Sequence, residues 1–148
     1  MSEFEKLLQE LKVDIQSLQE TFINPFIPTK PSTKPEVYAH HVKAYCILCH
    51  AAFEEYFETL ALNVMIRSLD EWMNSGKYTD TLVTLVSYYG LKLDIDLDEK
   101  HDETKVFDYL RSIFDEIKRR FSTDVHNNHG ISLKYLRSLL IPVAINIK

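Results

Sequence analysis

Apolar residues recur at spacings of three and four along most of the chain, which is the period of amphipathic helices. The first such stretch begins after Ser2, a residue that can cap a helix, and continues to about Phe22. A second, longer stretch begins near Pro35, since proline is favoured at the first helical position. Its apolar stripe comprises Val42, Tyr45, Cys46, Cys49, Phe53, Tyr56, Phe57, Leu60 and Val64. The pattern predicts two helices, and the second can break before "LDEWMNSG".

In the second half of the chain, the apolar spacing and the turn residues predict three further helices. They cover about residues 80–89, about residues 103–121, and the segment "LKYLRSLL", which Ser132 can cap and Pro142 ends. Each of the three glycines, Gly76, Gly90 and Gly130, follows an amphipathic stretch, as expected near helix C-termini. We therefore expect an all-α bundle of about five helices in a single domain over residues 1–148.

Two connections differ from the helices in composition. Four of the five prolines lie within residues 23–35, which predicts an extended, Pro-rich strap after the first helix. The segment "DIDLDE" places Asp94, Asp96 and Asp98 like the first three ligands of an EF-hand. Glu99 stands where that loop needs glycine, and Lys105 stands where it needs glutamate. This acidic stretch is therefore interpreted as a solvated loop.

Charge and composition narrow the classes of function. The 148 residues carry 17 Lys+Arg against 22 Asp+Glu, a formal net charge of -5. An acidic surface does not attract phosphate backbones, so any nucleic-acid site must be a local basic patch. The N-terminus does not resemble a secretory signal, and no run of 18 apolar residues occurs. We expect a cytoplasmic protein with no membrane contact and with reduced cysteines.

Residues 46–50, "CILCH", match the pattern that attaches a c-type haem. The favoured interpretation is two core cysteines, because the apolar stripe includes both and no export signal is present. His50 and Glu54 lie one helical turn apart. They can form a structural hydrogen bond on a bundle face or belong to a polar site at a partner interface.

A zinc site is disfavoured, since the pairs His126/His129 and His40/His41 lack an exposed Cys-x2-Cys loop to complete the ligand set. We expect neither a metal nor a cofactor.

The segment "KRRFSTDVHNNHG" is the best candidate for chemistry. Cations at a helix C-terminus favour the helix dipole, which is one sufficient explanation of Lys118, Arg119 and Arg120. The alternative is a phosphate contact. Metal-independent RNA cleavage needs a histidine to move the proton of the 2′-hydroxyl and an arginine to hold the phosphate. The polar residues that follow the three cations are His126, Asn127, Asn128 and His129.

Two segments, "HVKAYCILCHAAFEEYFE" and "VHNNHGISLKYLRSLLIPVAI", resemble the HEPN superfamily, and within it the RiboL-PSP-associated branch. The resemblance covers most of the chain. It implies an all-α bundle that dimerises. Many members are metal-independent ribonucleases of toxin–antitoxin, abortive-infection and CRISPR systems, whereas others are inactive binding or regulatory modules.

The resemblance also implies a catalytic signature of Arg, four to six residues, then His. Arg119 with six intervening residues and Arg120 with five fit this spacing to His126, although neither is followed by the usual Asn, Asp or His. The resemblance further places the signature after the leucine helix. Two interpretations stay open: the motif here is divergent, or the chain is a piece or a short version that lacks it, which the apolar ending "IPVAINIK" favours.

Three hypotheses follow. The first is a ribonuclease in which Arg119, Arg120 and His126 are catalytic at the two-fold interface of a homodimer. Lys118, Asn127, Asn128 and His129 would then bind the RNA. The second is a non-catalytic module that holds RNA or a partner protein of a defence or toxin–antitoxin system. The third, much weaker, is a haem or metal protein.

Overall fold

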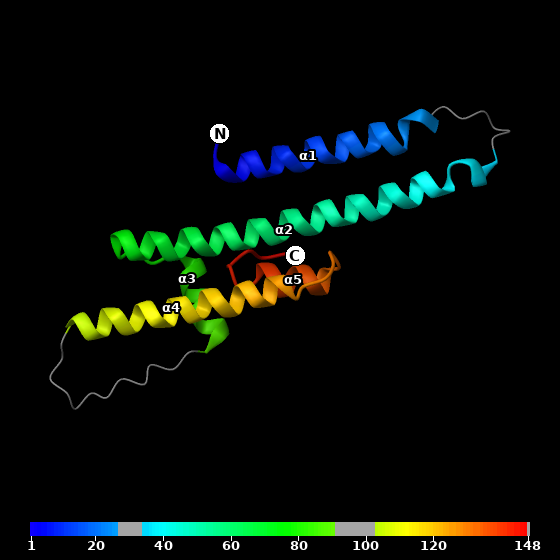
Figure 1. Cartoon of the computed structure of the whole chain (residues 1–148). Coiled ribbons are helices and arrows are strands. Elements are labelled where there is room, and N and C mark those ends of the chain that lie inside the picture. The colour runs from blue at the N-terminus through cyan, green and yellow to red at the C-terminus, as the bar shows by residue number, and fades with distance from the viewer. Residues whose placement is uncertain (27–33, 91–102, 148) are drawn as a thin grey trace. The chain divides into compact units, whose positions relative to one another are not determined.

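The computed structural model describes residues 1–26, 34–90 and 103–147 (Figure 1). These residues form helices and turns and contain no strand, which confirms the all-α prediction. The Pro-rich residues 27–33 and the acidic segment 94–99 lie outside the described residues. The elements are α1 (Glu3–Phe22), the short 3-10 helices η1 (Asn24–Phe26) and η2 (Pro35–Val37), α2 (Ala39–Ser75), α3 (Asp80–Tyr89), α4 (Glu103–His126) and α5 (Leu133–Leu140).

The chain divides into two compact units, each described by itself. The first comprises residues 1–60 and 130–132, and the second comprises residues 61–129 and 133–148. Helix α2 contributes its first part to one unit and its last part to the other.

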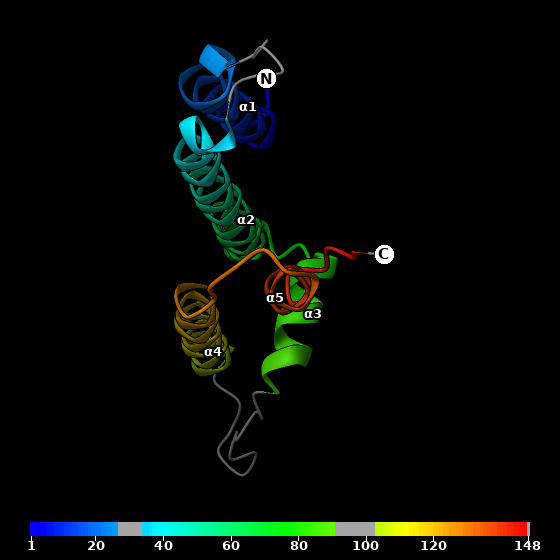
Figure 2. The same ribbon diagram turned by 90° about the vertical axis from the view of Figure 1, so that its right-hand side faces the viewer.

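In the first unit, α1 runs beside the first part of α2 (Figures 1 and 2). Ser2 caps α1 with a complete capping box, because its hydroxyl accepts from the Glu5 N–H at 3.2 Å and its own N–H donates to Glu5 Oε2 at 2.6 Å. Towards the other end, the His41 ring packs against Phe22 and Phe26, with ring centroids 6.4 and 4.5 Å away. Local capping and one aromatic cluster therefore define both ends of this helix pair.

The second unit holds most of the buried apolar side chains. Trp72 of α2 meets Phe114 of α4 edge to face, with ring centroids 4.5 Å apart. Thr81 of α3 donates its hydroxyl to the Val143 carbonyl at 3.1 Å, which ties the segment after α5 to this core. The other buried apolar residues here are Ala61, Met65, Leu69, Leu82, Leu85, Ile117, Phe121, Val125, Leu139 and Leu140.

Three expectations about the helices are corrected. Helix α2 does not break before "LDEWMNSG", because Leu69 and Trp72 belong to the core; it ends at Ser75, and Gly76 follows with a φ of 67°. Its α-helical part begins at Ala39, since Pro35 starts a separate 3-10 turn. Helix α4 continues five residues beyond Phe121 to His126, because Val125 extends the buried stripe by one more turn. The predicted bounds of α1, α3 and α5 agree with the structure.

Candidate functional site

The extension of α4 places the predicted Arg–His pair on one continuous helix. Arg119 and His126 are seven residues apart, which is about two turns or ~10 Å along the axis, so both project from the same face. Both side chains are exposed, as are those of Lys118 and Arg120. The helical structure therefore places the Arg119 and His126 side chains, which the sequence relates only by spacing, on the same side of α4.

Glu116 holds both arginines. Its carboxylate accepts from Arg119 Nε and Nη2 at 2.8 and 2.7 Å and from Arg120 Nε at 2.6 Å. Hydrogen bonds from Arg119 and then Arg120 lower the pKa of Glu116 to about 2, so the carboxylate stays ionised at neutral pH. Glu116 was not among the predicted site residues, although its spacing of three and four residues from the arginines is the helical signal for such a contact.

The surface around the arginines is less basic than the sequence suggests. Between residues 115 and 124, Asp115, Glu116 and Asp124 balance Lys118, Arg119 and Arg120, so three acidic residues meet three basic ones and the formal charge is zero. The Asp124 carboxylate accepts a hydrogen bond from the Tyr89 hydroxyl at 2.7 Å, which links α3 to α4. A ligand phosphate would therefore compete with carboxylates of the same helix.

The predicted polar run after α4 separates into exposed and buried residues. His126, Asn127 and His129 are exposed. Asn128 is only 8% exposed, and its Oδ1 accepts a hydrogen bond from the Ser138 hydroxyl of α5 at 3.4 Å. Asn128 therefore connects α5 to the end of α4 and does not belong to the exposed set.

The His50–Glu54 pair lies in the first unit. Glu54 Oε2 is 3.9 Å from His50 Nδ1, and Glu54 Oε1 accepts a hydrogen bond from the Gly130 N–H at 2.5 Å. The carboxylate therefore connects α2 to the turn before α5. This contact joins the two segments that carry the family resemblance, which lie 76 residues apart.

The predicted burial of the "CILCH" cysteines is wrong. Cys46 is exposed and Cys49 is half-buried, and both are free thiols. The buried part of α2 begins at Ala61, so the apolar stripe around the cysteines is only partly covered. A hydrogen bond to Cys49 is the largest cause that raises the pKa of Tyr45. Within the described residues, no group of three or more His, Cys, Asp or Glu side chains is placed to hold a metal ion.

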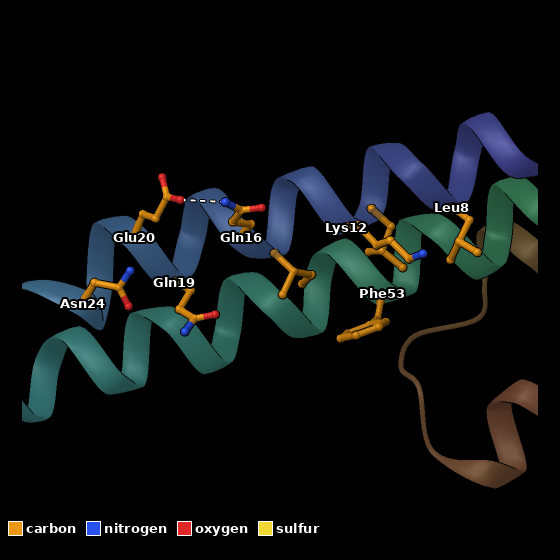
Figure 3. Close-up of a pocket in the computed structure, with 9 residues that line it drawn as sticks. Leu8, Lys12, Gln16, Gln19, Glu20, Asn24 and Phe53 are labelled. Atoms are coloured by element: carbon orange, nitrogen blue, oxygen red, sulfur yellow. Dashed lines mark hydrogen bonds between the residues drawn. The ribbon is translucent and has the colours of Figure 1, made fainter. Parts of the chain in front are cut away.

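A groove of about 650 Å³ lies between α1 and α2 in the first unit (Figure 3). Leu8 and Phe53 supply apolar surface, while Gln16 donates to Glu20 at 2.8 Å at the α1 side. None of the predicted site residues lines this groove.

Three comparisons bear on what kind of protein carries these features. Residues 2–148 match the RiboL-PSP-HEPN family, and no curated protein and no solved structure gives a significant match. The chain is therefore a helical domain of the HEPN class, and it belongs to the RiboL-PSP-HEPN family. HEPN domains are often ribonucleases or associated with defence systems. None of the described helices combines the length and apolar character needed to cross a lipid bilayer.

Proposed function

We propose that this HEPN domain acts on RNA as a metal-independent endoribonuclease, with Arg119 and His126 as its catalytic pair. The observation that carries the proposal is the unbroken course of α4 through His126, which puts both side chains on one exposed face two turns apart. A flexible arginine and an imidazole at this separation can contact one phosphodiester from two sides. Membership in a family whose relatives are often ribonucleases supports the same reaction class.

The proposed chemistry needs only these two groups and the RNA. The His126 imidazole takes the proton from a ribose 2′-hydroxyl, and that oxygen attacks the adjacent phosphorus. The bond to the 5′-oxygen breaks, and the leaving oxygen takes a proton from water. The resulting hydroxide takes the proton from the His126 imidazolium, and a 2′,3′-cyclic phosphate remains. Arg119 stabilises the charge that builds on the phosphate oxygens. Arg120 and Lys118 hold the neighbouring backbone, together with the exposed Asn127 and His129.

Self-association belongs to the same proposal. In one copy of the protein, the α4 face that carries Arg119 and His126 is open to solvent. A second copy would enclose the phosphate between two Arg–His pairs. Hydrodynamic mass across a concentration series tests this point, and a strict monomer at the concentration of maximal activity would contradict it. The biological setting we propose is a cytoplasmic defence or toxin–antitoxin system.

The direct test is cleavage of labelled RNA by the full chain in EDTA. The His126→Ala and Arg119→Ala variants should each lose about 100-fold or more in rate. His50→Ala is the matched control, because it removes an exposed histidine from the first unit and should retain the wild-type rate. An absence of cleavage at any wild-type concentration refutes the catalytic proposal.

A second candidate is a non-catalytic module that holds RNA or a protein partner. The hydrogen bonds from Arg119 and Arg120 to Glu116 favour it, since they direct both guanidinium groups towards the helix's own carboxylate. RNA binding without cleavage, in the same reaction with EDTA, supports this candidate over the first.

A further inference from the structure

The last part of the second unit contains basic residues but no acidic residue in its own sequence. From residue 125 to the end of the chain there is no Asp or Glu, while Lys134 and Arg137 lie on α5. Both side chains are exposed. Among the residues that the structure describes, neither of them forms an ion pair. This surface therefore differs from the charge-balanced face of α4.

Lys134 occupies a position where a cation is unfavourable. It is the second residue of α5, in the first helical turn, which contains no acidic residue. The N-terminal end of a helix carries partial positive charge, so a lysine there is locally repelled. Arg137 lies three residues further on, about 60° away around the axis, and adds like-charge repulsion to Lys134. Arg137 itself is in the last turn of α5, where the helix dipole favours a cation. No ion pair in the described part of the chain compensates Lys134, and an anionic ligand would.

An aromatic side chain lies on the other side of Lys134 from Arg137, about 160° from Arg137 around the axis, and α5 also contacts the end of α4. Tyr135 follows Lys134 and is 39% exposed, so its ring is accessible for stacking. Ser138, one turn after Lys134, shares its hydroxyl proton between the Tyr135 carbonyl at 2.8 Å and Oδ1 of the buried Asn128 at 3.4 Å. Since Asn128 lies between the exposed Asn127 and His129, this hydrogen bond attaches the basic face of α5 to the polar residues that follow α4.

We infer that Lys134, Tyr135 and Arg137 form a binding surface for single-stranded RNA, which holds the strand beside the end of α4. The inference rests on the proposed action on RNA and names the residues that bind it. The two cations contact phosphates and Tyr135 stacks on a base, the combination that binds single strands with little sequence preference. In this arrangement α5 supplies affinity, and the arginines of α4, already paired with Glu116, contribute less to it.

Binding and cleavage are measured separately. Fluorescence anisotropy with a labelled 2′-O-methyl oligoribonucleotide reports binding alone, because this probe has no free 2′-hydroxyl. Lys134→Ala combined with Arg137→Ala should weaken binding about 10-fold or more at 0.1 M salt, and should lower the slope of log K against log salt by ~1.4. The matched control combines Lys12→Ala with Lys43→Ala, which removes two exposed cations from the first unit.

The Tyr135 variants test the stacking contact. Tyr135→Ala should weaken binding about 5-fold or more, whereas Tyr135→Phe keeps the ring and should bind like the wild type. Thermal unfolding followed by circular dichroism verifies that each variant is folded.

The outcomes separate this inference from the proposed function. Wild-type affinity in the Lys134/Arg137 double variant, or equal weakening in the Lys12/Lys43 control, overturns the inference even if the wild type cleaves RNA. If this surface binds an acidic protein instead of RNA, the Lys134/Arg137 double variant keeps the wild-type affinity for the RNA probe. Binding that depends on Lys134 and Arg137, without cleavage of ordinary RNA, supports the inference and refutes the catalytic proposal. A wild type that does not bind the probe overturns the inference outright.

Discussion

Replacing Glu54 by alanine tests the hydrogen bond that connects the two segments resembling the HEPN superfamily. In the wild type, Glu54 Oε1 accepts the Gly130 N–H at 2.5 Å, and the other oxygen is 3.9 Å from His50 Nδ1. The change removes the acceptor and leaves the Gly130 N–H without its partner. The turn before α5 then loses its polar attachment to α2.

The size of the effect follows from the type of bond and its exposure. A hydrogen bond to a charged group stabilises by about 1.5–3 kcal/mol. The Glu54 side chain is 25% exposed, so water screens part of this contribution, and we expect about 1–2 kcal/mol. That free energy corresponds to a ~5- to 30-fold increase in the population of the locally open state.

Amide hydrogen exchange at Gly130 measures this opening directly. In Glu54→Ala the exchange rate should rise by that factor, whereas Glu54→Gln keeps a neutral acceptor and should show a smaller rise. His50→Ala serves as the control, because it leaves the hydrogen bond intact. An unchanged Gly130 exchange rate in Glu54→Ala would show that the contact does not hold the turn.

Three further predictions concern other contacts. Glu116→Gln frees the neighbouring arginines and removes one negative charge, so affinity for single-stranded RNA should rise ~5-fold at 0.1 M salt. Anisotropy titrations that show no gain would mean that the arginines do not face the RNA. Burial and the bond to Asp124 raise the pKa of Tyr89. The neutral hydroxyl therefore stabilises the fold fully below about pH 10, and this stabilisation is lost above pH 10, where the unfolded tyrosine ionises first. In Tyr89→Phe, the free energy of unfolding measured with denaturant should not show this loss above pH 10. The same dependence on pH in variant and wild type would contradict the prediction. Finally, the exposed Cys46 should react with a thiol reagent faster than the half-buried Cys49. Mass spectrometry of partially labelled protein measures both rates, and equal rates would contradict this prediction.

Local patterns predicted much of the helical structure. Ser2 caps α1 as expected, and the bounds of α3 and α5 follow from their turn residues and apolar spacing. These features depend on neighbours within about four residues, which a single sequence displays directly. The resemblance named the family that the comparison confirmed.

Burial and the end of α4 were harder to predict. An apolar stripe shows which face of a helix can be covered but not how far along its length a neighbour covers it, so Cys46 was expected in the core and is exposed. The end of α4 depended on whether Val125 found a place in the core of the second unit, where it is 3% exposed. That outcome moved His126 from an expected loop onto the helix.

The sequence by itself determined the helical class, the main breaks between helices and the family, because periodicity, capping and turn chemistry are local properties of the chain. Only the tertiary structure decided which polar residues are available to a ligand. It directed Asn128 towards Ser138 and Glu54 towards Gly130, and it left Lys134 and Arg137 exposed. Such choices depend on packing between segments far apart in sequence, since buried polar groups must find hydrogen-bond partners wherever the fold places them.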